Sequence, residues 1–447
     1  MDKFDIIIIG AGPAGKNIAL KLEQSGLNIA IIEKDKVGGT CLNEGCIPAK
    51  LYLESAGYVA KLKHFSQFGV HIDNLKFDLE ELKTKKEELL KLLGDGAKGK
   101  IEKSNIEFFQ GEASFIDETS VKVGEKTLKA DKFIIASGSV HRPHPLLEID
   151  GKQIISSREV FELKKLPNSI LIVGGGAIGC EFATFFNSLG TTVHIAEFTS
   201  QIVPAEDSDV AKTLQRELQK KGIKITVDTN VTSFTKEDDI VKVDMQTKKS
   251  SITESYELVL VSIGRAPNSA DLNLDNAGVI SDRGFVIVNE QLQTNITNIY
   301  ALGDVIPTPA LAHAAYNEAN ILAENIINKS TNTPSKIIPF VTFCQPQVAS
   351  VGENEKTLKT KNREYIAVKH FFKSNAKAKI KGDDSGFIKL LCEKDSGIIL
   401  GGSMIGNDTT ELIHEVLIAI EKRTTLEEIS NMVFAHPTLS ESLWEMA

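Results

Sequence analysis

Cysteine is scarce in this sequence: the 447 residues include five, an odd number, and only Cys41 and Cys46 lie close together. So few scattered thiols exclude the disulfide framework of a small secreted protein and favour a reducing compartment. A signal-peptide core is also missing, because the first apolar run, at residues 6–9, leads directly into glycines. We therefore expect a cytoplasmic protein, and a trimmed organelle protein would show the same pattern.

Positive charge is in short supply as well. The 51 Lys and Arg residues are outnumbered by 60 Asp and Glu, which leaves a net charge of -9. Nucleic acid is disfavoured as a partner, because a phosphate backbone needs a basic face. A composition of 42% hydrophobic and 25% charged residues excludes a disordered or membrane-spanning chain. At this length we expect about two to four domains.

What the sequence does contain is one glycine pattern, twice. An apolar run at residues 4–9 leads into Gly10, Gly12 and Gly15, then a helix-like stretch, a second apolar run and Glu33. This order is typical of a strand, glycine turn, helix and strand that bind a dinucleotide. The first glycine makes the tight turn, the second lets the backbone approach a pyrophosphate, and the third lets helix and strand pack closely.

The second copy begins at residue 169 and has the same spacing. Its members are an apolar run at 169–173, Gly174, Gly176, Gly179, a helix-like stretch, an apolar run at 193–196, and Glu197. From the first glycine to the acid is 23 positions in both copies, which makes two incidental turns a poor explanation. Glu197 favours NAD over NADP, because a carboxylate accepts from ribose hydroxyls and repels a 2'-phosphate. Two dinucleotides in one chain indicate a relay between two redox carriers.

The cysteine pair follows the first copy. On an ideal helix, two Cα atoms five residues apart are about 8.6 Å apart, beyond the usual reach of a disulfide. Bridging Cys41 and Cys46 therefore needs a distorted turn, and Gly45 and Pro48 stand where a distortion and a new helix start belong. A pair of buried thiols or half a zinc site is the alternative. The other three cysteines form no second ligand pair, so we expect no metal.

Residues 38–50 resemble the redox-active disulfide motif of the pyridine nucleotide disulfide oxidoreductases. The resemblance implies that Cys41 exchanges with substrate and that Cys46 lies against the flavin of FAD. It also implies that Lys50 sits near the flavin and pairs with Glu181 of the second glycine unit, and that Gly39 and Thr40 contact FAD. Glu44 departs from the family, which often has a neutral or basic residue there, and a negative charge could raise the pKa of the thiols.

Three further segments are similar to cofactor motifs of the same family. The resemblance assigns Ser137 and Gly138 of residues 134–139 to FAD, and Gly264 of residues 261–268 to NAD. In residues 298–304 it implies that Asp304 holds the ribityl chain of FAD, against the alternative of a helix N-cap. The resemblance also implies that residues 311–314 form a helix over the flavin, with Ala312 in contact with FAD.

Near the C-terminus, His436 is followed by Pro437, which suits the first position of a new helix and leaves His436 exposed at a bend. Glu441, five residues on, can fold back against the imidazole. A dithiol attacks only as its thiolate, with an ordinary pKa of about 8.5, so a histidine oriented by a carboxylate is a suitable base. Without the cysteine motif, a simple surface pair would be the better interpretation.

Residues 436–441 resemble the dihydrolipoamide dehydrogenase branch of the family more than the glutathione reductases. The resemblance implies a flavoprotein that oxidises protein-bound dihydrolipoamide with reduction of NAD. Its expected partners are a second copy, forming a homodimer, and a lipoylated carrier protein of a 2-oxoacid dehydrogenase or glycine cleavage complex. The alternatives are an NAD(P)H-dependent reductase of glutathione or a related disulfide, and a non-catalytic FAD-binding protein.

We expect an α/β fold with two Rossmann-like dinucleotide-binding domains and a C-terminal α+β dimerisation domain. The resemblance divides the chain into a first part of the FAD-binding domain at 1–143, an NAD-binding domain at 144–265, a return to the FAD domain at 266–334, and a dimerisation domain at 335–447.

Overall fold

The computed structural model describes residues 2–62 and 65–446, and these fall into two compact units. The first unit comprises residues 1–49, 83–142 and 264–336, and the second comprises residues 50–82, 143–263 and 337–447. Three of the divisions, at 142/143, 263/264 and 336/337, lie within two residues of expected boundaries. The separation of an NAD-binding domain from a dimerisation domain stays a prediction, because both segments belong to the second unit.

The first unit is built on a seven-stranded sheet with the order β3-β2-β1-β6-β5-β4 and β19 paired to β6. Its strands are β1 (Asp2–Ile9), β2 (Ile29–Glu33), β3 (Glu107–Gln110), β4 (Ala113–Asp117), β5 (Ser120–Val123), β6 (Lys126–Ile135) and β19 (Ile299–Ala301). The pairs among β3, β2, β1, β6 and β19 are parallel, and β4 and β5 are antiparallel. All five residues of β2 are buried, as a parallel strand covered on both faces requires.

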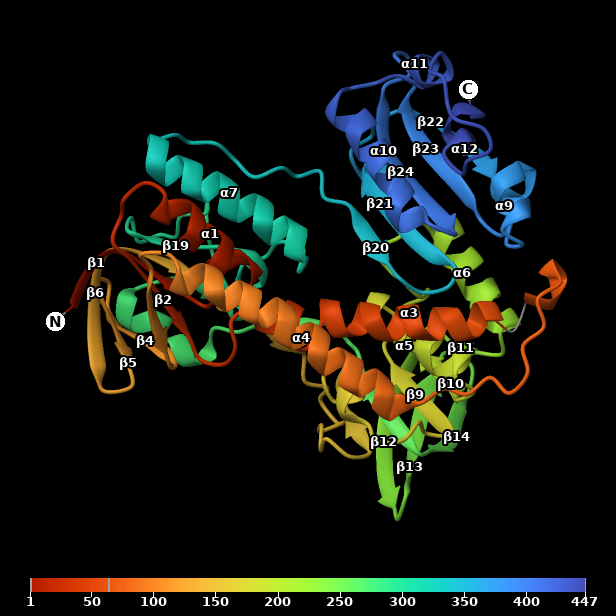
Figure 1. Cartoon of the computed structure of the whole chain (residues 1–447), viewed down its shortest axis with the longest axis horizontal. Coiled ribbons are helices and arrows are strands. Elements are labelled where there is room, and N and C mark those ends of the chain that lie inside the picture. Colours follow the sequence, from red (N-terminus) through yellow and green to blue (C-terminus); the bar gives the residue numbers. More distant parts are fainter. Residues whose placement is uncertain (1, 63–64, 447) are drawn as a thin grey trace. The chain divides into compact units, whose positions relative to one another are not determined.

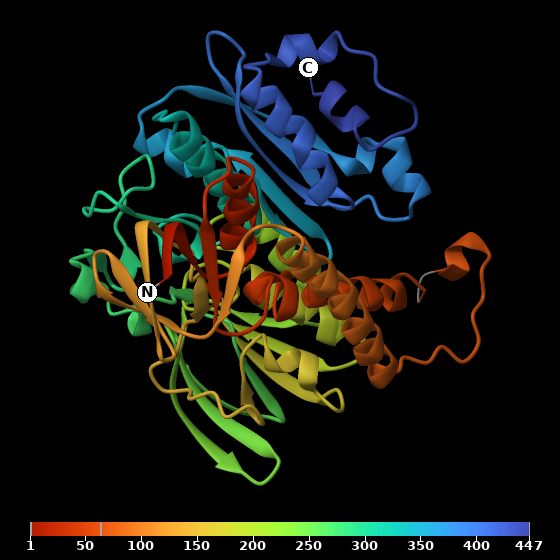
Figure 2. The same ribbon diagram turned by 60° about the vertical axis from the view of Figure 1, so that its left-hand side comes forward.

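Helices α1 (Pro13–Glu23) and α7 (Ala312–Asn328) pack side by side on this sheet (Figures 1 and 2). Asn17 of α1 donates to Asn320 of α7 at 3.0 Å. The helix expected from residues 311–314 is present, with Leu311 as its N-cap and Ala312 as its first residue. The unit also contains the short helix α2 (Gly39–Asn43) and most of the long helix α4 (Leu79–Glu102).

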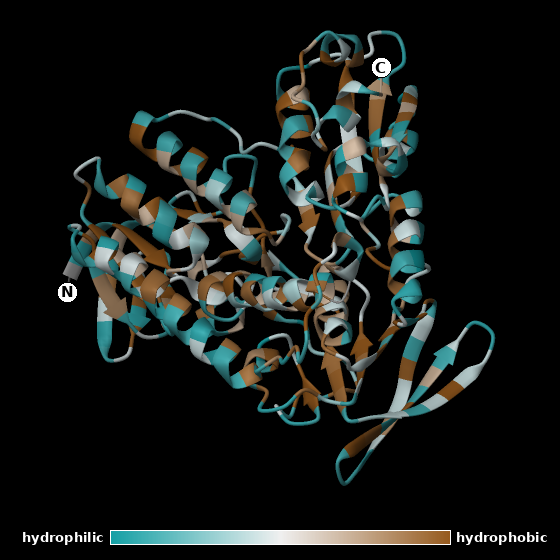
Figure 3. Ribbon diagram, turned by 45° about the vertical axis from the view of Figure 1, so that its right-hand side comes forward, coloured by the Kyte–Doolittle hydropathy of each residue, from teal (hydrophilic) through white to brown (hydrophobic). Residues whose placement is uncertain are grey.

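The second unit contains a five-stranded parallel sheet, ordered β11-β10-β9-β15-β8. Its strands are β8 (Ile154–Ile155), β9 (Ser169–Val173), β10 (Thr192–Ala196), β11 (Lys224–Thr226) and β15 (Leu258–Val261). Colouring by hydropathy shows the apolar character of such central strands against the mixed faces of the helices (Figure 3). The unit's helices here are α5 (Ala177–Ser188) and α6 (Ser208–Lys220), and an antiparallel sheet follows from β12 (Thr229–Glu237), β13 (Ile240–Thr247) and β14 (Ser251–Tyr256).

The C-terminal part of the second unit is a five-stranded antiparallel sheet, ordered β20-β21-β24-β23-β22, with α10 packed on β21 and β24. The strands are β20 (Phe340–Thr342), β21 (Gln347–Gly352), β22 (Tyr365–Phe371), β23 (Phe387–Glu393) and β24 (Ile399–Gly406). The helices are α8 (Glu355–Thr360), α9 (Ala376–Ile380), α10 (Thr409–Glu421), α11 (Leu426–Ser430) and α12 (Glu441–Trp444). This is the α+β arrangement expected of the last segment.

The remaining elements are short, apart from helix α3. They are α3 (Cys46–Leu62), the paired strands β7 (Ser139–His141) and β16 (Arg265–Pro267), the paired strands β17 (Ser281–Asp282) and β18 (Phe285–Val286), and the 3-10 turns η1 (Phe65–Phe68), η2 (Glu159–Glu162), η3 (Ala270–Leu272), η4 (Leu274–Ala277), η5 (Gly303–Val305) and η6 (Phe372–Ser374). Among the described residues, no helix is both long enough and apolar enough to cross a membrane.

Candidate active site

The two glycine turns have nearly the same geometry. Gly10 has a φ of 105° and Gly174 one of 107°, which is the left-handed region where an L side chain is strained. A Cβ on Gly15 would lie 1.8 Å from the Gly10 carbonyl oxygen, and one on Gly179 would lie 2.0 Å from that of Gly174. In both copies only a glycine lets the helix pack this closely against the turn, which is what the spacing predicted.

The two acids that end the second strands are buried and held in the same way. Glu33 accepts from the backbone N–H groups of Ala11 at 2.7 Å and Asp35 at 2.8 Å. Glu197 accepts from the N–H groups of Gly175 at 2.6 Å and Thr199 at 2.7 Å, and also from the Thr199 hydroxyl at 2.7 Å. A carboxylate has about four acceptor sites, so each acid retains at least one lone pair for a ribose hydroxyl at the mouth of its turn.

The first unit fits a bound FAD on two independent observations. The buried hydroxyl of Ser137 has no hydrogen-bond partner among the described residues, although a buried hydroxyl normally has one. The next residue, Gly138, has a φ of 72° and space around it, since no described atom lies within 4 Å of where its Cβ would be. The hydroxyl of Ser137 is available to hydrogen-bond a polar ligand, and the space at Gly138 lets that ligand approach the backbone.

The cysteine pair spans a break between two helices. Cys41 lies in α2, which ends at Asn43, and Cys46 is the first residue of α3. Glu44, between them, has a φ of -141°, far from helical values. A Cβ on Gly45 would lie 3.1 Å from the Thr40 carbonyl oxygen, so a glycine suits this tight passage. The expected distorted turn is present, and neither thiol is disulfide-bonded in the structure.

Lys50, one helical turn after Cys46 along α3, forms an ion pair with Glu181 of α5. Its ammonium nitrogen lies 2.9 and 3.0 Å from the two carboxylate oxygens and 4.6 Å from the centre of the Phe343 ring. The backbone N–H of Phe343 donates to the same carboxylate at 2.9 Å. Glu181 is almost fully buried, whereas the Lys50 side chain is 36% exposed. The ion pair that the resemblance implied is therefore present, and Glu181 fixes the position of the Lys50 ammonium.

Asp304 lies in η5 and does not cap a helix. Its carboxylate accepts from the Ser139 hydroxyl at 2.5 Å, and the Arg265 guanidinium donates to that hydroxyl at 2.6 Å. Arg265 Nε is 3.8 Å from the carboxylate itself. Strands β7 and β16 pair directly and bring Ser139 and Arg265 together. The chain of contacts fixes the direction of Asp304, as a carboxylate that holds a cofactor requires.

Arg265 also bears on the negative charge of Glu44. Burial lowers the pKa of Arg265, and Asp304, Cys46 and Glu44 oppose that effect because each favours the cation. The loop acid therefore has a largely buried cation within electrostatic reach.

The histidine–glutamate dyad is formed in the C-terminal segment. His436 Nδ1 lies 2.8 Å from Glu441, and the Thr438 backbone N–H donates to the other oxygen of that carboxylate at 2.7 Å. The Thr438 N–H and then His436 lower the pKa of Glu441, so the carboxylate is charged at neutral pH. His436 is 73% exposed. The other imidazole nitrogen, Nε2, takes no part in the dyad and is accessible to a substrate.

One local expectation was wrong. Pro437 does not start a helix: residues 431–440 form turns and bends, and α12 begins at Glu441. The Thr438 N–H donates to the Glu441 carboxylate in this turn.

The remaining predicted residues lie in both units. Gly39 and Thr40 belong to α2, and Ala312 is the first residue of α7, all in the first unit. Gly176 is the N-cap of α5 in the second unit, with no described atom within 4 Å of its missing Cβ. Gly264 has a φ of 103° and belongs to the first unit, whereas the other residues assigned to NAD belong to the second.

Comparison with known proteins decides the family. The profile described as "Pyridine nucleotide-disulphide oxidoreductase" matches residues 4–319, and the profile for the dimerisation domain of that family matches residues 338–447. The chain belongs to this family. It is therefore an oxidoreductase that uses FAD and NAD, and its last segment is a dimerisation domain.

Individual family members give the same result. The chain is 36% identical to the mitochondrial dihydrolipoyl dehydrogenase of Pisum sativum, over 100% of this chain and 91% of that protein, and 36% identical to the dihydrolipoyl dehydrogenase of Bacillus subtilis, over 98% and 97%. Among solved structures, the HOCl-induced flavoprotein disulfide reductase RclA of Escherichia coli matches with a TM-score of 0.90 and 26% identity, over 100% and 99% of the two chains.

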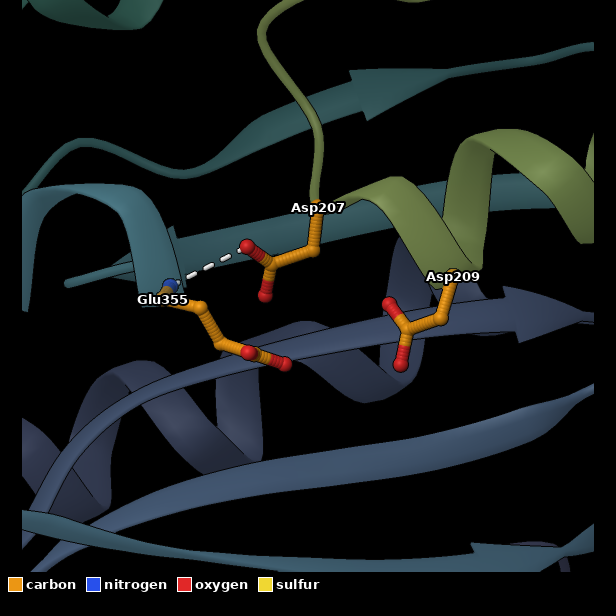
Figure 4. A group of neighbouring side chains, drawn as sticks. All are labelled: Asp207, Asp209 and Glu355. Atoms are coloured by element: carbon orange, nitrogen blue, oxygen red, sulfur yellow. Dashed lines mark hydrogen bonds between the residues drawn. The ribbon is translucent and has the colours of Figure 1, made fainter. Parts of the chain in front are cut away.

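One cluster of this family member resembles a metal site. The oxygens of Asp207, Asp209 and Glu355 lie within 4.8 Å of one another, and the Glu355 N–H donates to Asp207 at 3.0 Å (Figure 4). The buried ammonium of Lys389 lies 2.7, 2.8 and 3.0 Å from these three carboxylates. A lysine thus provides the positive charge that a metal would supply, and the cluster joins α6, α8 and β23.

The sequence did not reveal the residues that position the predicted site residues through hydrogen bonds and ion pairs. Ser139 and Arg265 lie in segments that resembled cofactor motifs, yet no signal in the sequence pairs a strand at 139–141 with one at 265–267. Lys389 is a lone lysine in an apolar strand, which is a weak signal of a buried ion pair.

Proposed function

We propose that this protein is a dihydrolipoyl dehydrogenase, which oxidises the dihydrolipoyl group of a carrier protein and reduces NAD. The observation that carries the proposal is the match over nearly the whole chain to relatives of that name. The site supports it, because a cysteine pair across a helix break and an exposed, oriented histidine supply the two kinds of chemistry that dithiol oxidation needs.

The proposed reaction starts with proton removal. His436 takes the proton from one dihydrolipoyl thiol, and Glu441 stabilises the resulting imidazolium. The substrate thiolate attacks the sulfur of Cys41 in the oxidised pair, the sulfur–sulfur bond breaks, and Cys46 is released as a thiolate. His436 then passes that proton to solvent and removes the proton of the second lipoyl thiol. The resulting thiolate attacks the substrate sulfur of the mixed disulfide, which closes the lipoyl ring and releases Cys41 as a thiolate.

FAD, when bound, supplies the two-electron chemistry that connects the reduced cysteine pair to NAD. The protein residues have supporting roles in the proposal. Ser137, Gly138 and Asp304 bind and orient the flavin nucleotide, and Lys50, held by Glu181, places a positive charge near the flavin. Glu197 accepts from the ribose of NAD and disfavours a 2'-phosphate.

A steady-state assay tests the proposal. Purified holoenzyme is expected to turn over dihydrolipoamide with NAD and to show little activity with glutathione disulfide and NADPH. Activity with the second pair alone would refute it. The second candidate, a reductase of another disulfide, is favoured by the similarity to the disulfide reductase of Escherichia coli, and this assay separates the two.

We further propose that His436 serves the cysteine pair of the other subunit in a homodimer. Co-expressed Cys41→Ser and His436→Gln subunits give heterodimers in which one complete site forms only across the subunits. Activity near half that of wild type, from two inactive parents, is expected. Inactive heterodimers would show that histidine and cysteines act within one chain.

The lipoyl group is proposed to arrive on a separate carrier protein of a 2-oxoacid dehydrogenase or glycine cleavage complex. A cytoplasmic location stays a prediction from the scarcity of cysteine, and the pea relative is a mitochondrial protein.

A further inference from the structure

Lys16 is a cation with an unusual environment. It lies in the second turn of α1, where its backbone N–H donates to Gly12, the N-cap of the helix, at 3.0 Å. The side chain is half-buried, yet its ammonium has no hydrogen bond or ion pair within residues 2–62 and 65–446. Burying a charge costs free energy unless it is paired, so the unpaired state of this partly desolvated ammonium is a notable feature of α1.

The start of α1 touches the start of α2. The Gly38 N–H donates to the Ala11 carbonyl at 2.8 Å, and a Cβ on Gly39 would lie only 2.9 Å from the Cα of Gly12. Cys41 is two residues after Gly39, and Lys16 is one helical turn after Gly12. The close backbone contact therefore places the lysine and the cysteine on two touching elements.

Electrostatics agree with this placement. Burial and the neighbouring ammonium of Lys100 lower the pKa of Lys16, and Cys41 opposes both effects because its thiolate favours the cation. Lys100, near the end of α4, also has no ion pair in the described part of the chain. Two ammonium groups without ion pairs thus repel each other, and one anion between them would stabilise both charges.

The other side of the cysteine pair is different. Arg265 is the cation that bears on Cys46 and Glu44, but its guanidinium already donates to Ser139 and approaches Asp304. Tyr316 of α7 also bears on the pair, since burial and then both cysteines raise its pKa. Lys16 combines electrostatic reach to Cys41 with an ammonium that has no ion pair among the described residues.

We propose that Lys16 is a positioning residue that stabilises negative charge on the Cys41 sulfur. The proposal rests on the proposed function, in which Cys41 is the thiol that exchanges with substrate. When the second lipoyl thiolate closes the ring, the bond between Cys41 and the substrate sulfur breaks and the electron pair stays on Cys41. A nearby ammonium makes this thiolate a better leaving group.

The test follows the alkylation of Cys41 by iodoacetamide in holoenzyme reduced with NADH, measured by peptide mass spectrometry from pH 5 to 9. Lys16→Met is expected to move the midpoint of the rate upward by about 0.5–1 pH unit, since an opposite charge is lost. Lys16→Arg should restore the wild-type midpoint. Lys21→Met, in the last turn of the same helix, is the matched control and should leave it unchanged.

An unchanged midpoint in Lys16→Met would overturn the inference. Lys16→Gln keeps much of the side-chain length and replaces the methionine variant if that protein does not retain FAD. Failure of the proposed function is distinguishable, because it would appear as absent turnover of dihydrolipoamide with NAD by the wild-type protein, whereas the alkylation midpoint of Cys41 is measured without that substrate.

Discussion

At the scale of single residues, the dyad shows how an exposed histidine acquires a fixed orientation. Glu441 uses one oxygen for the His436 imidazole and the other for the Thr438 backbone, so the carboxylate cannot rotate away without losing both hydrogen bonds. The orientation of the imidazole is thus set by the backbone, although His436 itself is largely exposed.

Removing the charge of Glu441 should therefore change the pH dependence of catalysis. In Glu441→Gln, the imidazolium loses its negative neighbour, so we expect the acidic limb of the kcat/KM profile to move to lower pH. His436→Gln, which lacks the base, should reduce kcat roughly 10²- to 10⁴-fold. Glu427→Gln, an exposed carboxylate of α11, is the control. A Glu441→Gln profile that overlays the wild type would contradict a role in orienting the base.

The sequence could predict the residues whose reactive groups stand in recognisable motifs. It could not predict the residues that orient them through hydrogen bonds. Cys41, His436 and Lys50 are named by their motifs, because their chemistry requires those residue types. Ser139 and Arg265 have no such signature, since a hydroxyl and a guanidinium become informative only when β7 and β16 bring them to Asp304. Lys16 likewise follows an ordinary glycine turn.

At the scale of secondary structure, the periodic apolar runs were the most reliable signal. Strand β9 has the predicted bounds, and β1 begins two residues earlier than predicted because polar Asp2 and Lys3 pair with β6. The turn after His436 was the failure, since the preference of proline for the first position of a helix did not start one at Pro437, and α12 begins only at Glu441.

The start of helix α5 contains two glycines, Gly176 and Gly179, that are required for different reasons. A Cβ on Gly179 would overlap the Gly174 carbonyl, so Gly179→Ala should destabilise the protein by about 1–3 kcal/mol or more. Gly176 has an ordinary φ of -72° and open space, so Gly176→Ala should keep the melting temperature.

For NAD binding the order of the two variants should be reversed, with Gly176→Ala the more strongly affected. We expect Gly176→Ala to raise the KM for NAD roughly tenfold, because the new methyl group stands where the pyrophosphate approaches the helix. Thermal melts and NAD titrations of both proteins check this. A Gly176→Ala enzyme with wild-type KM would show that NAD does not bind at this turn.

At the scale of the whole molecule, the Lys389 cluster ties together segments that are 182 residues apart, from Asp207 to Lys389. Burial lowers the pKa of Lys389, but the hydrogen bonds to the three carboxylates outweigh that effect and raise it to about 12. The lysine therefore stays charged throughout the physiological range.

Lys389→Met should leave three carboxylates uncompensated and reduce the stability of the second unit by about 3–5 kcal/mol. The control is Lys369→Met, which removes a more exposed partner of Asp209 at 2.7 Å and should cost less than about 1 kcal/mol. Urea denaturation followed by tryptophan fluorescence and by flavin fluorescence measures both. Equal losses in the two variants would contradict the special position of Lys389.

Glu206, beside this cluster, gives stability a pH dependence. Burial raises its pKa to about 7, with a contribution from Asp207, while Ser350 and Lys389 oppose the shift. An acid whose folded pKa lies above its ordinary value of 4.5 stabilises the fold at low pH, and this contribution is lost as pH rises toward 7. Relative to wild type, the melting temperature of Glu206→Gln should therefore increase between pH 5 and 8. A constant difference would contradict the assignment.

The close contact of Gly12 with Gly39 has no counterpart in the second turn, where the space at Gly176 is open. The two turns are otherwise alike, so we expect the difference to affect how long each nucleotide stays. A loop that lies against the first turn should slow the dissociation of FAD, which would then stay bound through many reaction cycles. The uncovered second turn suits a coenzyme that must depart after every cycle and exchange with the pool in the surrounding solution.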